Sequence, residues 1–355
     1  GAGVGNLTLN GAISMTGDGN YGAYTAGEIT GAVTINGAVA SQGQYSVGVQ
    51  TTGKIDGALN LYSTVSSTGY ASFTRPSATI LSTVQATPSQ VEQGGSALVV
   101  QGSVVGGIFL GAPPPNTASG STADLDLDGV ADGSEGTAVV QTFGAAPAMV
   151  VGGASAITVG QFGACNGALY GPGNNCFGLI NEGVIAGAGV YDSVSATGLD
   201  IGAGGGGVAI SGGIRIANTG SITATAYQSN STALLMESGA SAPLIQNEGI
   251  IWASVAAAAG AVNATAVQIN SGASVPAFTN YGAISAAVVG DSASAYGVVD
   301  SSGTIATFKN YGTISTGLTA SSPGDTLTGQ TVALNLSANT TGVAFTDWKS
   351  VVEGK

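Results

Sequence analysis

The residues with the clearest capacity for chemistry are five acids in the segment DLDLDGVADGSE, Asp124 to Glu135. Carboxylates stand at positions 1, 3, 5, 9 and 12 of this segment, and Gly129 stands at position 6. Five like charges within twelve residues repel one another unless a cation gathers them, and carboxylate oxygens suit the hard cation Ca²⁺. The segment therefore predicts a calcium site, with a solvated acidic loop as the alternative.

This spacing resembles the twelve-residue calcium loop of EF-hand proteins and the Asp-rich loops of dockerin and thrombospondin type 3 repeats. The resemblance implies six ligands, with a backbone carbonyl from the valine and a bidentate glutamate: Asp124, Asp126, Asp128, Val130, Asp132 and Glu135. Gly, Pro, Ser and Thr precede the loop and the strand-like segment TAVVQTF follows it, so no helix pair is available to open and close. We expect Ca²⁺ here as a structural ion that fastens an insertion.

The two cysteines, Cys165 and Cys176, lie in the short segment GACNGALYGPGNNCFG. Its Gly and Asn residues favour turns that bring the ends of a small loop together, so we predict a local disulfide and an oxidising, extracytoplasmic compartment. The sequence contains no His, and the Cys and His ligand sets of structural zinc therefore cannot be assembled.

The acids outside the calcium loop are sparse and do not predict a catalytic site. Glu182 and Glu248 occupy equivalent corners of the repeat described below, and we interpret them as exposed, stacked side chains. Asp200 and Asp300 each follow an apolar strand, and a surface position fits them as well as a catalytic one; the run Gly204 to Gly207 predicts a flexible turn. We predict a non-catalytic protein; the alternative is a polysaccharide-degrading β-helix enzyme, either a lyase or a glycosidase, which would need paired carboxylates.

The elements that must position these segments are short β-strands. Sixty glycines and only 7% charged residues leave few of the Glu, Lys and Arg that helix surfaces carry. Near the N-terminus the segments LTLNGAI, VTINGAV and LNLYSTV begin at Leu7, Val33 and Leu59, at a constant spacing of 26 residues. Each alternates apolar and polar residues, as a strand with one buried face does, so one segment marks one coil of a solenoid.

The C-terminal half repeats a different motif, in which an apolar residue, Asn and Gly precede an Ile. Its Asn residues are spaced by 29 to 37 residues: Asn181, Asn218, Asn247, Asn280 and Asn310. We expect Asn and Gly to turn the chain with positive φ, and the stacked Asn side chains to form a hydrogen-bonded ladder. A second strand recurs between these corners, starting at Thr197, Thr232, Thr265 and Tyr296.

Together these patterns predict an all-β fold, a parallel β-solenoid (β-helix) that is right-handed by default. We divide it into N-terminal coils over 1–110, an insertion over 111–176 and C-terminal coils over 177–355. The insertion would hold the calcium loop, strand-like segments and the disulfide loop.

The NxGxI corners, the Ala, Gly, Ser and Thr content and the acidic pI resemble passenger regions of Gram-negative autotransporters and related surface β-solenoids. The resemblance implies an extracellular or cell-surface structural protein of a Gram-negative bacterium. Such a protein would assemble head-to-tail with itself into filaments or matrix, or act as an adhesin passenger that contacts surface polysaccharide or another cell. A net charge of −13 with six scattered basic residues argues against nucleic acid as a partner, and no apolar run reaches the ~18 residues of a membrane span.

Overall fold

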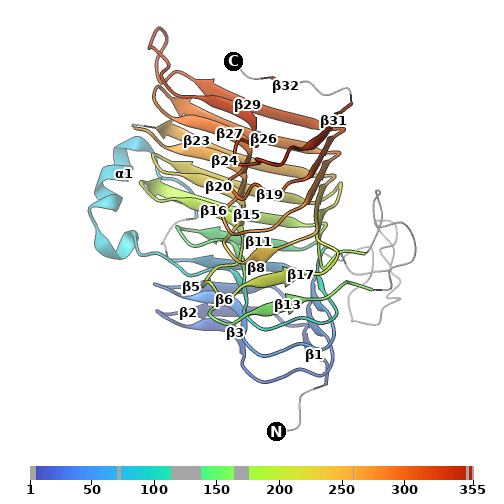
Figure 1. Cartoon of the computed structure of the whole chain (residues 1–355). Coiled ribbons are helices and arrows are strands. Elements are labelled where there is room, and N and C mark those ends of the chain that lie inside the picture. Colours follow the sequence, from blue (N-terminus) through green and yellow to red (C-terminus); the bar gives the residue numbers. More distant parts are fainter. Residues whose placement is uncertain are drawn as a thin grey trace, which may run out of the picture.

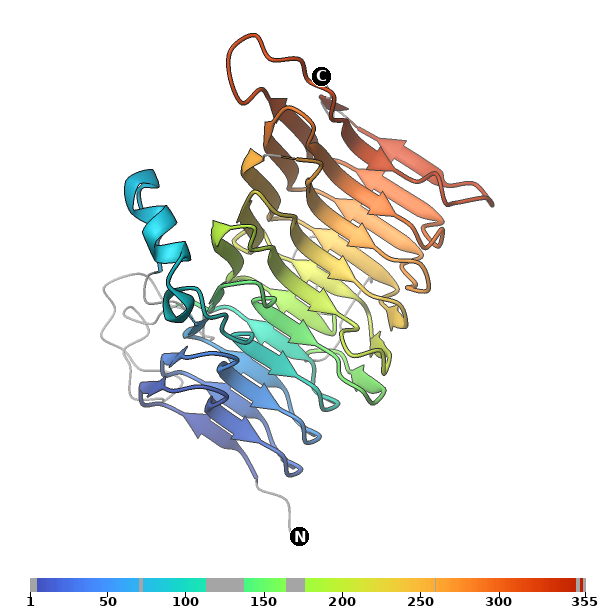
Figure 2. The same ribbon diagram turned by 90° about the vertical axis from the view of Figure 1, so that its left-hand side faces the viewer.

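The computed structural model describes residues 5–69, 73–112, 137–163, 176–258, 260–348 and 352–353. Over these residues the chain winds into a stack of coils, with the N-terminal coils at one end and the C-terminal coils at the other (Figure 1). Figure 2 shows the strands of successive coils lying side by side in rows. The predicted all-β fold, a parallel β-solenoid, is confirmed.

Each coil contributes one strand to each of three long sheets, except that the last described coil adds none to the third; the strands of one sheet are neighbours across successive coils. The first sheet contains β1 (Leu7–Leu9), β4 (Val33–Ile35), β7 (Leu59–Leu61), β10 (Ile108–Leu110), β14 (Leu179–Asn181), β18 (Ile214–Ile216), β22 (Leu244–Asn247), β25 (Ala277–Asn280), β28 (Thr307–Asn310) and β31 (Ala344–Asp347). The second contains β2 (Ile13–Thr16), β5 (Val39–Gln42), β8 (Thr64–Thr68), β11 (Val139–Phe143), β15 (Val184–Asp192), β19 (Ser221–Tyr227), β23 (Ile250–Ala258), β26 (Ala283–Gly290), β29 (Thr313–Thr319) and β32 (Val352–Glu353).

The third sheet contains β3 (Tyr21–Thr25), β6 (Val47–Thr51), β9 (Leu98–Val100), β12 (Met149–Val151), β16 (Ala196–Ile201), β20 (Ser231–Met236), β24 (Asn263–Ile269), β27 (Ser294–Asp300) and β30 (Thr331–Asn335). A short fourth sheet contains β13 (Ile157–Val159), β17 (Val208–Ile210) and β21 (Ala240–Ser241). At 4.8 Å between strands, a ten-stranded sheet is about 43 Å long.

The pairing register confirms the 26-residue repeat, because Leu7 pairs with Val33 and Val33 with Leu59. It also confirms the second strand of the C-terminal repeat, where Thr197, Thr232 and Thr265 are stacked in successive coils. Strands β11, β12 and β13, which the sequence analysis assigned to the insertion, pair on both sides with strands of the stack or continue it.

A single apolar core runs through the stack from Ile29 to Ala333. It is built of columns in which each coil repeats the same kind of side chain, such as Ile185, Ile222, Ile251, Ile284 and Ile314 in the second sheet. The rings of Phe278 and Phe308 stack in the first sheet, with centroids 5.1 Å apart. Because like residues lie above one another, each coil covers the apolar surface of the coil before it.

The chain leaves the stack between β8 and β9, where it forms the helix α1 (Ala78–Gln85) and the 3₁₀ turn η1 (Pro88–Gln90). Figure 1 shows α1 beside the stack. Leu81 of α1 packs with Val190 and Tyr191 of β15, and Arg75 binds the carboxylate of Asp192 while its guanidinium lies 4.0 Å from the ring centre of Tyr227. These contacts hold the segment between β8 and β9 against the later strands β15 and β19. None of the helices in the described part of the chain has the length and apolar character needed to span a membrane.

The Asn ladder at the corner after the first sheet is confirmed, with one correction to its members. Asn247 Nδ2 donates to Asn280 Oδ1, and Asn280 Nδ2 donates to Asn310 Oδ1, each at 2.8 Å. The register places Ile216, not Asn218, between Asn181 and Asn247. The turn after Ile216 is two residues longer than the turns after Asn181, Asn247, Asn280 and Asn310, so Asn218 lies exposed within it.

The reason predicted for the corner glycines is wrong. None of the glycines at this corner has positive φ. Instead the coils approach so closely that a Cβ on Gly249, Gly282 or Gly312 would lie 2.0 to 2.1 Å from the carbonyl oxygen of the coil before it. Glycine is required here by backbone contact between coils, and the side-chain ladder stands directly beside that contact.

Candidate functional site

Most of the residues that the sequence predicted as a site lie outside the residues that the structure describes. These are the calcium loop, with Asp124, Asp126, Asp128, Val130, Asp132 and Glu135, and the first cysteine, Cys165. Cys176 is described: it is buried, and its carbonyl oxygen accepts a hydrogen bond from Gln161 Nε2 at 3.1 Å. The calcium site and the disulfide stay predictions.

The corner acids Glu182 and Glu248 are held by a basic residue that sequence reasoning did not single out. Arg215 stands in the coil between them and donates two hydrogen bonds to the Glu248 carboxylate, at 3.0 and 2.9 Å. Its guanidinium lies 3.9 Å from Glu182. The side chains of Arg215 and Glu248 are each only 6% exposed, so the interpretation of Glu248 as an exposed corner is wrong. Arg215 and Glu248 therefore form a buried ion pair, while the side chain of Glu182 is 37% exposed.

Asp300 is also buried and also satisfied, which corrects its interpretation as a surface residue. Its carboxylate accepts hydrogen bonds from the backbone N–H groups of Ser302, Gly303 and Ile305 and from the Ser302 hydroxyl. A carboxylate with this many donors fixes the turn after β27 and has a structural role.

Asp200 is different, because it is buried without such partners. It lies in β16 between the core residues Leu199 and Ile201, so its side chain faces away from the core. Its neighbours in the adjacent coils are Val150 and Leu235, and only 8% of its surface is exposed. Its Oδ1 atom is buried and makes no hydrogen bond within the described structure. The interpretation of Asp200 as a surface residue is therefore wrong as well.

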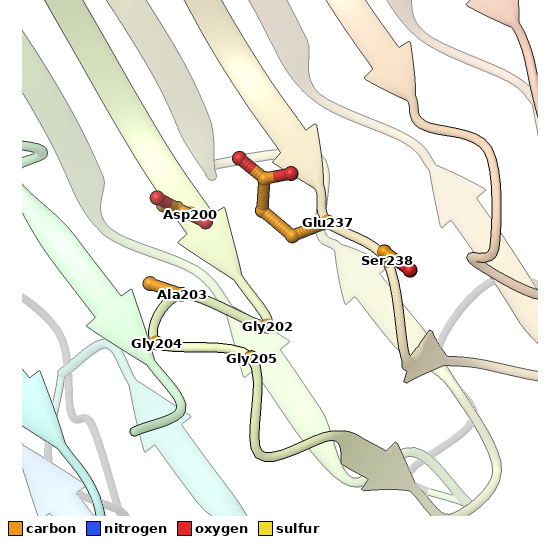
Figure 3. A pocket seen from close by; sticks show the side chains of 7 residues that line it. All are labelled: Asp200, Gly202, Ala203, Gly204, Gly205, Glu237 and Ser238. Atoms are coloured by element: carbon orange, nitrogen blue, oxygen red, sulfur yellow. The ribbon is translucent and has the colours of Figure 1, made fainter. Parts of the chain in front are cut away.

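Asp200 lines a pocket of about 370 Å³ at the corner after the third sheet. The pocket is lined by Asp200, Gly202, Ala203, Gly204, Gly205, Glu237 and Ser238. Figure 3 shows the carboxyl groups of Asp200 and Glu237 on the same side of the loop formed by the glycines. One coil supplies Asp200 and the loop, and the next coil supplies Glu237 immediately after β20.

The glycine loop has a conformation that other residues rarely adopt. Gly202, Gly204, Gly205 and Gly207 all have φ between 76° and 101°. A Cβ on Gly204 would also lie 2.7 Å from the backbone of Gly153 in the preceding coil. The predicted turn is present, it packs on the preceding coil at Gly204, and its residues Gly202, Gly204 and Gly205 line the pocket.

The carboxylates of Asp200 and Glu237 repel each other. Burial, and secondly the negative charge of Glu237, raises the pKa of Asp200 from 3.8 to about 7. Asn270 Nδ2 donates to Glu237 Oε2 at 2.7 Å and so orients that carboxylate. Two carboxylates that face one pocket can bind a cation. The described residues contain no group of three or more acidic, Cys or His side chains that could hold a metal, so any ion here needs backbone or water ligands as well.

Sequence reasoning missed this pocket because it treated each acid alone. Alignment of the strand repeats places Asp200 opposite Leu235, and Glu237 then falls opposite Gly202. The sequence did contain a signal. Asp200 has apolar neighbours in the adjacent coils, a glycine run follows it, and a second acid lies close to it one coil later.

The architecture defines the class of the chain, which is a parallel β-solenoid. Among its described acids, Asp200 has a buried carboxylate oxygen without a hydrogen bond. Comparison with known proteins adds no narrower assignment, since no family model, no curated protein and no solved structure matches the chain significantly.

Proposed function

We propose that the chain is a non-catalytic structural rod of a bacterial surface. The observation that carries the proposal is the one-dimensional packing, in which strands of the three long sheets pair with equivalent strands of the neighbouring coils and one core runs through the whole stack. Rigid length and long lateral faces are what such an architecture provides.

The rod could act through its ends or through its sides. Strands β1, β2 and β3 are the outermost of the described strands at one end, and β30, β31 and β32 at the other. A strand edge offers unpaired backbone groups, which a further coil of the same polypeptide or of a second copy would satisfy. Contact between unlike ends of two copies is heterologous and builds open filaments. We favour this head-to-tail assembly into filaments or matrix.

The lateral faces support the second form of the proposal, an adhesin passenger of the autotransporter type. Tyr281 and Tyr311 stack with ring centroids 5.0 Å apart and are 36% and 38% exposed, and Trp252 is 38% exposed. Exposed aromatic rings on a rigid face are suited to a surface polysaccharide or another cell as partner.

The predicted calcium loop and the predicted disulfide between Cys165 and Cys176 belong to the same proposal. Extracellular calcium at millimolar concentration would fill even a weak loop site, and a disulfide persists in an oxidising compartment. Both would fasten the segments that leave the stack and so support a long-lived extracellular rod.

Negative-stain electron microscopy and light scattering of the purified chain test the proposal. Fibres whose length grows with protein concentration support head-to-tail assembly, and isolated rods that bind glycans or cells support the adhesin form. Cleavage of acidic polysaccharides that is lost on Asp200→Asn would instead support a polysaccharide-degrading enzyme and overturn the proposal. An Asp18→Asn variant, which changes an exposed acid at another coil, is the matched control.

A further inference from the structure

The pocket at Asp200 has no role in a rod that works only through its length and faces. A carboxylate that is more than nine-tenths buried costs several kcal/mol unless it is paired or hydrogen-bonded. The other strongly buried acids of the described structure meet that requirement. Glu248 is held by Arg215, and Asp300 accepts three backbone hydrogen bonds. Asp200, with its unpartnered Oδ1, is the exception.

The residues around Asp200 offer oxygen and no positive charge. The seven residues that line the pocket include two carboxylates, one hydroxyl and the backbone of a glycine loop, and none of them is basic or aromatic. Glu237 is oriented through Oε2 by Asn270, and its carboxyl group stands on the same side of the pocket as that of Asp200 (Figure 3). An anion is therefore excluded by charge, and a sugar ring has no aromatic face to stack on.

We propose that this pocket binds a hard divalent cation of the calcium type. The carboxylates of Asp200 and Glu237 are its charged ligands, and backbone carbonyl oxygens of the loop Gly202–Gly205 and water complete the shell. Calcium accepts six to eight oxygen ligands in irregular geometry, whereas magnesium demands a near-octahedral set, so two carboxylates beside a glycine loop suit calcium better. The ion would neutralise the unpaired acid and join two successive coils at one corner.

The site is independent of the predicted calcium loop at Asp124 to Glu135, and the experiment must separate the two. The full chain, freed of metal with a chelator, is titrated with CaCl₂ by isothermal calorimetry. The double variant Asp200→Asn with Glu237→Gln keeps side-chain shape and removes both charges. The double variant Asp124→Asn with Glu135→Gln does the same in the loop, and Glu92→Gln is a control for the loss of an acid elsewhere.

The expected result is the loss of one equivalent of bound calcium in the pocket variant, with no such loss in the Glu92→Gln control. The loop variant should retain that equivalent. Unchanged calcium stoichiometry and affinity in the pocket variant would overturn the proposal.

A second measurement on the unmodified chain keeps the test valid if a variant does not fold. Hydrogen exchange with and without CaCl₂ should show added protection over 200–207 and 237–240. No change in these segments at a calcium concentration that saturates the calorimetric signal counts against the site. Neither result depends on whether the rod forms filaments.

Discussion

The Asn ladder allows a prediction whose magnitude follows from the hydrogen bonds of each rung. Asn280 makes three side-chain bonds: it accepts from Asn247 Nδ2, and it donates to Asn310 Oδ1 at 2.8 Å and to Thr313 O at 3.2 Å. A buried hydrogen bond contributes about 1 kcal/mol net, and each partner left unsatisfied adds to the loss. Asn280→Ala should therefore lower the free energy of unfolding by about 3 to 4 kcal/mol.

Asn247 is the end of the ladder next to Ile216, and its replacement by Ala should lower the free energy of unfolding less than the replacement of Asn280. Its Oδ1 is buried without a hydrogen bond, because Ile216 occupies the rung before it and carries no amide. Asn247→Ala removes two donated bonds but also removes this unsatisfied acceptor, whose burial costs about 1 to 3 kcal/mol. The net loss should be only about 1 to 2 kcal/mol. Asn218→Ala, in the exposed turn, should change stability by less than about 0.5 kcal/mol.

Urea unfolding followed by circular dichroism gives the three free energies, and hydrogen exchange locates the loss. Protection should fall first in peptides that span 278–284 and 308–314, since each coil contacts only its neighbours. Equal losses at Asn247 and Asn280, or a loss at Asn218 as large as either, would refute the assignment of the ladder and its interruption.

Three further predictions concern charged groups. Arg215→Met should cost about 3 to 5 kcal/mol because it leaves the Glu248 carboxylate buried and unpaired, and adding Glu248→Gln should recover most of that loss in the same unfolding assay. Arg75→Ala should raise proteolysis and hydrogen exchange across 73–97 without unfolding the stack, since it removes the contacts with Asp192, Val190 O and the Tyr227 ring; loss of global stability would contradict this. In EDTA, the free energy of unfolding should fall as pH rises from 4 to 8. The Asp200 pKa is about 7 when folded and 3.8 when unfolded, so between these two pH values the folded state binds a proton that the unfolded state has released. The free energy of unfolding should therefore be about 4 kcal/mol lower at pH 8 than at pH 4, whereas Asp200→Asn should show a flatter profile.

The fold was largely predictable because the pairing register of a solenoid appears in the sequence as a regular spacing of similar segments. The 26-residue spacing of Leu7, Val33 and Leu59 survives unchanged as strand pairing, since one coil must match the next residue by residue. The error at Asn218 has a physical reason, because a corner can lengthen by two residues without moving the strands. Asn218 therefore matches the sequence motif, but Ile216 holds the structurally equivalent position. Strand pairing aligns the buried residues of successive coils, and it aligns Ile216, not Asn218, with Asn181 and Asn247.

Prediction of the site failed for a different reason. Burial of an outward-facing side chain depends on what its neighbours in the adjacent coils and its own turn cover, and a strand pattern does not report this. Asp200 lies within β16 and faces outward, whereas Asp300 ends β27 in the inward column that continues Met236 and Ile269. Both are buried, but Asp300 accepts hydrogen bonds from the turn after β27, and Asp200 Oδ1 has no hydrogen bond within the described structure. The helix α1 was missed for a related reason, because it is eight residues long and held by contacts with β15 rather than by its own sequence pattern.

The longer turn after Ile216 has a consequence for how such a protein changes over generations. Corners tolerate added residues while the strands keep their register, and coils of very different length, including one that carries a helix, share one core. A gene encoding this architecture can gain or lose a whole coil by unequal recombination in register, and it can acquire a new loop at a corner without disturbing neighbouring strands. The pocket beside Asp200 lies at one such corner, where the glycine loop after β16 meets Glu237 of the next coil.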